Sequence, residues 1–289
     1  MPELIVNNVT VRYKKKVGIK NATFQVNRQE IVGFIGADGA GKSSLMHAIA
    51  GVKEFTGEIV YNGYKYHSPK EAEKIKSYIG FMPQGIGLIL YPLLSVKEHL
   101  DFFTYIRGIK KNKEYWQYRK KLLEMAGLLE FQDREAGKLS GGMQQKLSLI
   151  CTLIHKPKLL ILDEPTTGVD PISRQQLWEI IKEIRDKDGI TAIISTGYMQ
   201  EAEKMDKVLL FDEGQIIAKG KAQELINSVR PYTYIETKCT EECFSFNKRT
   251  YSLRPLNVPH AEPDLESVFF SQVTIVHLHL LDKAQVASL

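Results

Sequence analysis

The chain has 289 residues, of which 43% are hydrophobic and 25% are charged. This composition is sufficient for one large domain or two modest ones with a sizeable apolar core. The net charge of +5 is only mildly basic and does not by itself indicate a nucleic-acid partner. The three cysteines favour neither a disulfide framework nor a zinc site, and they suggest a reducing compartment.

The apolar runs in the sequence fall far short of the roughly twenty residues that a membrane-spanning helix needs. The N-terminus lacks the basic-then-apolar pattern of a signal peptide. If the protein serves a membrane, we expect it to act from the surface, through a partner protein.

The first part of the chain is predicted to form mainly strands. Apolar runs and alternations predict one strand over 4–6 and 9–11, with a small interruption between the two parts. Further strands are predicted at 22–26, 30–35, 57–61 and 78–82. A glycine-rich break at 36–41 precedes a predicted helix over 42–50, which ends at Gly51.

The second part begins with helical patterns and then alternates. Helices are predicted at 96–106, 113–125 and 141–154. After Pro157, strands at 158–162, 190–195 and 207–211 alternate with helices at 172–185 and 199–205. Such alternation predicts a sheet with parallel strands covered by helices. The helical insert, about 85–155, would form a separate lobe.

The last stretch, 230–289, differs in composition. It has β-like pieces at 232–237 and 273–281 and three prolines between Pro255 and Pro263. No catalytic constellation stands out in it.

Residues 36–43 have the spacing G-x-x-x-x-G-K-S between a predicted strand and a predicted helix. In this context glycines let backbone N–H groups face phosphate oxygens, and the helix N-terminus adds positive potential. The lysine reaches the β- and γ-phosphates and the serine hydroxyl suits magnesium. The sequence therefore predicts a nucleoside triphosphate site with Mg²⁺, lined by Gly36, Asp38, Gly39, Ala40, Gly41, Lys42, Ser43 and Ser44.

Asp163 and Glu164 follow the buried-strand run 159–162. A strand of this kind delivers them to the carboxyl edge of the sheet, where ligands bind in open α/β folds. Asp163 would support magnesium, and Glu164 would polarise the attacking water. The alternative is that the two acids cap a following helix.

Residues 139–144, Leu-Ser-Gly-Gly-Met-Gln, resemble the signature motif of ABC ATPases, which opens a helix in that family. The resemblance implies that Ser140, Gly141 and Gly142 bind the γ-phosphate held by an opposite ATPase domain. The alternative is a plain helix cap, with serine before two glycines.

The resemblance covers about residues 4–226 and extends to other positions. Tyr13 matches the aromatic residue that stacks on adenine. Gln84 matches the glutamine that joins the sheet to the helical lobe and senses magnesium and water. The segment 168–170 matches the loop that crosses the dimer seam. Residues 169–174 and 263–269 are similar to the drug-type and ABC-2-type exporter ATPases.

The resemblance implies an α/β fold with a RecA-like P-loop core, an N-terminal antiparallel β-subdomain and an inserted helical subdomain. It implies an ATPase domain over 1–229, with a helical subdomain at about 85–155, and an extension of unknown role over 230–289. The implied function is the nucleotide-binding subunit of an exporter, which hydrolyses ATP with Mg²⁺.

The partners implied are a second ATPase domain and an integral membrane permease, with no nucleic acid. The permease would dock near residues 85–92, and the chain would be cytoplasmic at the inner face of the membrane. Soluble ABC proteins that act on ribosomes or DNA are the alternative, but the chain shows one set of motifs and no sustained heptads.

Two positions depart from the family's pattern. Gly197 stands where the family places a histidine that contacts the γ-phosphate and orders the water. Glycine cannot make that contact, so we expect slow hydrolysis at the chain's own site and intact nucleotide binding. This also leaves open a non-hydrolysing regulatory protein. Asp38 replaces a frequent asparagine in a loop that can face solvent.

Overall fold

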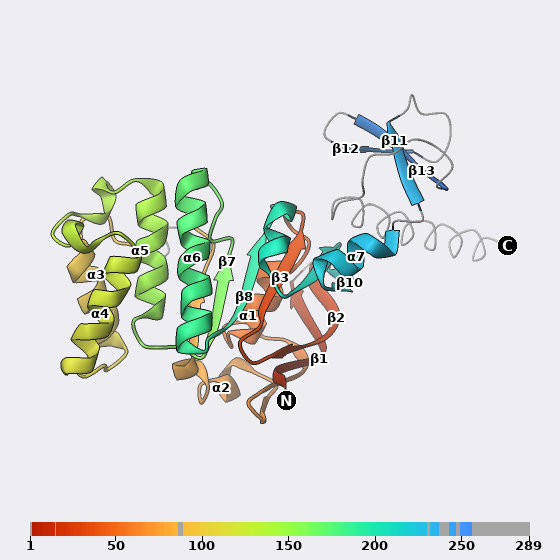
Figure 1. Ribbon diagram of the computed structural model, residues 1–289. Helices are drawn as coiled ribbons and strands as arrows, with labels where there is room; N and C mark the ends of the chain where they lie inside the picture. Colours follow the sequence, from red (N-terminus) through yellow and green to blue (C-terminus); the bar gives the residue numbers. More distant parts are fainter. Residues whose placement is uncertain are drawn as a thin grey trace.

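The computed structural model describes residues 2–14, 16–85, 89–229, 232–236, 243–246 and 249–255. Two neighbouring sheets form the body of the molecule, and three helices gather in a lobe at one end (Figure 1). Within these ranges no helix is both long and apolar enough to cross a membrane.

The N-terminal sheet is antiparallel, with the order β2-β1-β4-β5. Its strands are β1 (Pro2–Tyr13), β2 (Lys16–Asn27), β4 (Thr56–Tyr61) and β5 (Tyr64–Tyr66). The interruption expected between Val6 and Val9 is a shift of register against β2 within one continuous strand. Such a shift bends the strand without ending it.

The central sheet has six strands in the order β10-β9-β3-β8-β7-β6. They are β3 (Ile31–Gly36), β6 (Ile79–Met82), β7 (Leu159–Asp163), β8 (Thr191–Thr196), β9 (Lys207–Asp212) and β10 (Gln215–Gly220). All neighbours pair in parallel except β10, which pairs antiparallel with β9 at one edge. The predicted parallel sheet is confirmed.

Both faces of the central sheet are buried. Along β7, Leu160 and Leu162 join one apolar core, whereas Leu159 and Ile161 join the other. The period of two in a strand sends successive side chains to opposite faces, so a continuous apolar run suits a sheet covered on both sides. Polar side chains are therefore displaced to the strand ends.

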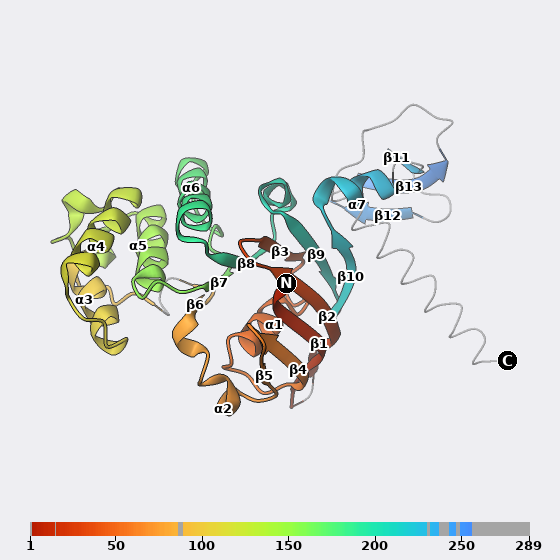
Figure 2. The same cartoon turned by 60° about the horizontal axis from the view of Figure 1, so that its bottom comes forward.

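Helices from different parts of the chain cover the two faces. Helix α1 (Lys42–Ile49) follows β3 and packs Leu45 and Met46 into the core shared with the antiparallel sheet. Helix α6 (Pro171–Asp188) contributes Leu177 and Ile181 to the other core. In both views α6 lies between the lobe and the strands of the sheet (Figure 2).

The lobe consists mainly of α3 (Val96–Ile106), α4 (Lys113–Met125) and α5 (Gly141–Leu153), with bounds within a residue of the prediction. Each helix begins at a side-chain cap, namely Ser95, Asn112 and Ser140. Such caps satisfy N–H groups of the first turn, which have no partner within the helix.

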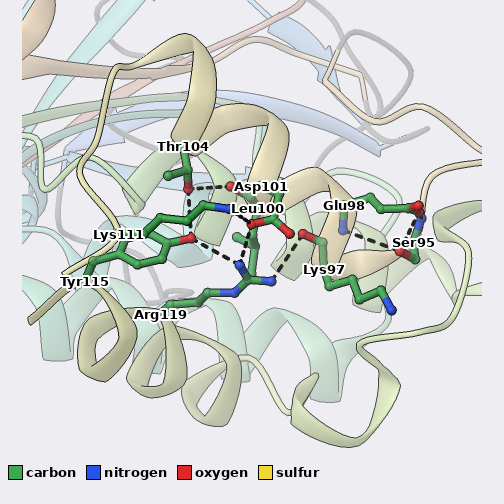
Figure 3. A network of polar contacts seen from close by, with 9 residues as sticks. All are labelled: Ser95, Lys97, Glu98, Leu100, Asp101, Thr104, Lys111, Tyr115 and Arg119. Atoms are coloured by element: carbon green, nitrogen blue, oxygen red, sulfur yellow. Dashed lines mark hydrogen bonds and ion pairs between the residues drawn. The ribbon is translucent and has the colours of Figure 1, made fainter. Parts of the chain in front are cut away.

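A buried arginine joins α3 to α4 (Figure 3). Arg119 donates to the Asp101 carboxylate at 2.8 Å, to the Tyr115 hydroxyl at 3.1 Å and to the Lys97 carbonyl at 3.2 Å. Its side chain is 7% exposed. A guanidinium with several fixed donors can satisfy acceptors of two helices at once, so this network fixes the α3–α4 pair.

The structure differs from the prediction at several short elements. The helix expected at 199–205 is a 3-10 helix, η5 (Met199–Lys204). Six residues leave too few apolar positions to distinguish the two helix types by periodicity. The short helix α2 (Pro69–Ala72) and the 3-10 turns η1 (Lys76–Tyr78), η3 (Leu129–Phe131) and η4 (Ala136–Lys138) were not predicted.

After β10 the chain forms α7 (Ala222–Val229), which was not predicted. The piece expected at 232–237 is the strand β11 (Tyr232–Glu236), which pairs with β13 (Arg249–Pro255) and thereby joins β12 (Cys243–Phe246) in a small antiparallel sheet. The piece expected at 273–281 and the exporter-like residues 263–269 lie outside the described residues.

Candidate nucleotide site

The glycine-rich loop joins β3 to α1 as predicted. Gly39 and Gly41 have positive φ, at 81° and 105°, a region that glycine adopts without strain. A Cβ on Gly41 would lie 2.2 Å from the Gly18 carbonyl oxygen, so the loop packs directly on β2. The N–H groups at the start of α1 are thereby turned toward the loop interior, where an anion would be stabilised.

Lys42 is the first residue of α1, and its side chain folds back over the loop. Its Nζ donates to the carbonyl oxygens of Gly36 at 2.7 Å and Ala37 at 3.0 Å, and the residue is 4% exposed. Burial lowers its pKa, and the nearby Glu164 carboxylate opposes that shift. The hydrogen bonds of the ammonium go to neutral carbonyl groups, so it can move to phosphate oxygens, with which it forms stronger charge-assisted hydrogen bonds. Asp38, in the same loop, is exposed, as expected.

Asp163 and Glu164 stand at the carboxyl end of β7, between β6 and β8 in the sheet. Neither acid caps the following helix, because the N-cap of α6 is Asp170. Asp163 is 2% exposed and Glu164 is 8% exposed. Glu164 has a φ of 50°, which is uncommon for a residue with a side chain and recurs at functional sites.

Ser195, at the end of β8, connects the two acids. Its hydroxyl accepts from the Glu164 backbone N–H at 2.8 Å and donates to the Asp163 carboxylate at 2.5 Å. Ser195 is fully buried. Sequence reasoning missed it, because a serine near the end of a predicted strand signals nothing until β8 is known to lie beside β7.

The Glu164 carboxylate brings three predicted residues together. Gln84 Nε2 donates to its Oε2 at 2.8 Å, and Lys42 Nζ lies 3.9 Å from its Oε1. Gln84 follows β6, Lys42 opens α1, and Glu164 follows β7, so three chain segments converge at one edge of the sheet. Thr167 also donates to Oε2, at 3.1 Å, and it was not predicted.

Tyr13 lies next to the loop. Its hydroxyl is 3.2 Å from the Ser44 hydroxyl, and Lys53 Nζ lies 4.1 Å from the centre of its ring. The ring is half exposed, with 42% of the residue accessible. An aromatic surface is therefore available beside the phosphate loop, where a base could stack.

The magnesium prediction can be tested against the donors that are present. Ser43, Asp163 and Gln84 offer a hydroxyl, a carboxylate and an amide oxygen, the hard donors that Mg²⁺ prefers. Among the described residues no group of three or more His, Cys, Asp or Glu side chains could hold a metal alone. Three donors of this kind would leave room for water and substrate phosphates in the octahedral shell of Mg²⁺.

The signature residues lie in a different place. Ser140 caps α5, and its Oγ accepts from the Met143 N–H at 3.3 Å, so the plain-cap interpretation is correct as a local description. A Cβ on Gly142 would lie 2.2 Å from Ser173 Oγ, so Gly142 packs on the first turn of α6. Helix α5 is separated from α1 in both views (Figures 1 and 2).

Gly197 follows β8 and is exposed. Among the described residues, apart from its two chain neighbours, no atom lies within 4 Å of the position that its Cβ would take. The next residue, Tyr198, is turned to α6, where the Arg174 guanidinium lies 4.2 Å from its ring centre. The Tyr198 ring therefore packs on a side chain of α6, and position 197 itself carries no side chain.

The chain is similar to known proteins in sequence and in fold. The family model described as "ABC transporter" matches residues 19–167. YbhF of Escherichia coli, a probable multidrug ABC transporter ATP-binding protein, is 38% identical over 208 residues, which make up 72% of this chain and 35% of YbhF. The chain thus spans about a third of that relative. LnrL of Bacillus subtilis, a linearmycin resistance ATP-binding protein, is 35% identical over 235 residues, 81% of this chain and 74% of LnrL.

Solved structures share the fold. CbiO1 of Clostridium perfringens, part of an ABC transporter complex, superposes with a TM-score of 0.69 at 26% identity over 79% of this chain and 94% of its own. The ATP-binding cassette MJ0796, solved as a dimer bound to ADP and phosphate, superposes with a TM-score of 0.68 at 25% identity. The superposition covers 75% of this chain and 98% of MJ0796. The expected RecA-like α/β fold is confirmed. The chain therefore belongs to the ABC transporter family and carries its ATP-binding domain.

Proposed function

We propose that the chain is the nucleotide-binding subunit of an ABC exporter, in which ATP hydrolysis drives a membrane permease. The convergence of Lys42, Gln84 and Glu164 at the end of the phosphate loop carries the proposal. It places a phosphate-binding cation, an amide and a candidate base within one small region. The relatives named above for multidrug transport and linearmycin resistance support an export role.

Each residue has a role in this scheme. The loop residues from Gly36 to Ser44 would bind the phosphates, with Lys42 shifting from loop carbonyls to phosphate oxygens. Tyr13 would stack on adenine. Ser43, Asp163 and Gln84 would hold Mg²⁺, which neutralises charge on the phosphates when bound. Glu164 would accept a proton from the attacking water.

A second ATPase domain would complete the site. Ser140, Gly141 and Gly142 stand at the start of α5, and α5 lies in the lobe, away from α1 (Figure 2). We propose that they face the γ-phosphate bound by a partner domain, in a head-to-tail dimer. The contact of Gly142 with Ser173 would transmit a movement of the signature residues to α6.

We propose that residues 1–229 act as the ATPase domain, with its helical subdomain at about 85–155, and that 230–289 are an extension of unknown role. The domain would attach to the cytoplasmic face of the membrane through the permease, near residues 85–92. Expressed alone it should remain in the soluble fraction, and it should co-purify with a permease when that partner is present. Stable binding to pure lipid vesicles would contradict this part of the proposal.

A second candidate function is a regulatory ATP-binding subunit that does not hydrolyse. The empty space at Gly197 favours it, because the family's water-ordering imidazole is missing there. Direct measurement of hydrolysis decides between the two functions.

Lys42→Ala tests the site itself. Loss of the ammonium should remove most ATP affinity in calorimetry, because charge-assisted contacts to the phosphates disappear. Lys70→Ala, at an exposed position on α2, is the control and should bind ATP normally. Equal ATP binding by native protein and Lys42→Ala would show that this loop is not the nucleotide site.

A further inference from the structure

The Thr167 hydroxyl is the second donor to the Glu164 carboxylate. Its Oγ1 donates to Glu164 Oε2 at 3.1 Å, and its backbone N–H donates to the Glu164 carbonyl at 3.3 Å. The turn from 164 to 167 therefore closes on itself through a backbone and a side-chain contact. The Thr167 side chain is exposed, so burial in a core does not explain why its hydroxyl is turned to the acid.

Both donors act on the same carboxylate oxygen. Gln84 and Thr167 each donate to Oε2, whereas Oε1 faces Lys42 Nζ at 3.9 Å. A single hydrogen bond would let the carboxylate rotate about its terminal bond, because that torsion is broad. A second donor on the same oxygen restricts the rotation and leaves Oε1 as the oxygen that can accept a proton.

We propose that Thr167 is a positioning residue, whose hydroxyl orients the Glu164 carboxylate toward the attacking water. Resting on the proposed ATPase function, this inference adds a residue that acts through Glu164 and does not touch the reacting atoms. Correct orientation of a base is a large part of its catalytic effect.

The decisive pair of variants is Thr167→Val and Thr167→Ser. Valine has nearly the same shape without the hydroxyl, and serine keeps the hydroxyl. Loss of a hydrogen bond to a charged group should lower kcat about tenfold in Thr167→Val, while KM and the calorimetric ATP affinity change by less than about twofold. Thr167→Ser should recover kcat to within about threefold of the native value.

The neighbouring threonine provides a matched control. Thr166 is fully buried, and its hydroxyl donates to Glu201 at 3.0 Å, away from Glu164. Thr166→Val should therefore lower the unfolding temperature more than Thr167→Val and lower kcat less. If both threonines had a purely structural role, kcat would follow stability, and Thr166→Val would lower kcat more than Thr167→Val.

The outcomes separate this inference from the function on which it rests. If the native protein hydrolyses ATP and Thr167→Val keeps the native kcat, the positioning role is wrong and the ATPase function stands. If the native protein binds ATP but shows neither hydrolysis nor tighter binding of ADP with aluminium fluoride than of ADP, hydrolysis at this site is refuted, and the role of Thr167 with it.

Discussion

Restoring an imidazole at position 197 is the most direct test of how this site works. The change is Gly197→His, made in the purified chain. The backbone at Gly197 can accept a histidine without strain, because its φ is not positive. Within the part of the chain that the structure describes, only the adjacent residues would lie within 4 Å of the Cβ. We therefore expect the variant to fold, with stability unchanged or raised by up to about 1 kcal/mol through reduced freedom of the unfolded chain.

The expected gain in rate follows from what the imidazole adds. A group that orders or deprotonates the attacking water commonly contributes about 10²–10⁴-fold in rate, which corresponds to about 3–5 kcal/mol of barrier. The imidazole would enter a site in which Glu164 is already held by Gln84 and Thr167. Because neighbouring groups have not adapted to it, we expect at least a tenfold rise in kcat, with little change in ATP affinity.

Phosphate release under saturating Mg-ATP measures kcat, and calorimetry with the native and variant chains measures ATP affinity. Gly197→Ala is the matched control, because it removes the freedom of glycine without adding an imidazole, and its rate should stay at the native level. Fast hydrolysis by the native chain, unaffected by Gly197→His, would refute the reasoning and require another residue to perform the histidine's task.

Three further predictions concern buried polar groups. Ser195→Ala should destabilise the fold by about 1–3 kcal/mol in urea unfolding, because a buried N–H and a buried carboxylate lose their partner; native stability would contradict it. Arg119→Met should cost about 1–3 kcal/mol and speed amide exchange in α3 and α4 without weakening ATP binding, whereas Lys120→Met, with a side chain 67% exposed, should be nearly neutral. For His155, burial lowers the pKa to about 4, so the folded state keeps it neutral while the unfolded state binds a proton below about 6.5. The free energy of unfolding is therefore unaffected by His155 above about pH 6.5. It falls as the pH drops from there toward 4, by at most about 3 kcal/mol. His155→Gln should flatten that part of the native stability–pH curve, and parallel curves would refute it.

The sequence by itself determined the local parts of the site. The phosphate loop could be predicted because its spacing sets the path of a few consecutive residues, and Lys42 and Ser43 follow directly. The strand before Asp163 could be predicted because four consecutive apolar residues, 159–162, suit a sheet that is covered on both faces. Helices α3, α4 and α5 were predicted within a residue because a clear apolar period coincides with a capping residue.

The tertiary structure alone decided which of these parts meet. Ser195 lies 31 positions from Glu164, and Gln84 lies 80 positions from it. The resemblance to ABC ATPases assigned Gln84 a role, but nothing along the chain shows that it shares Oε2 of Glu164 with Thr167. These contacts depend on β7 lying between β6 and β8 and on the pairing of Asp163 with Ser195. Periodicity shows which face of a strand is buried, but strand order and register arise from packing of the whole chain, so they became known only with the fold.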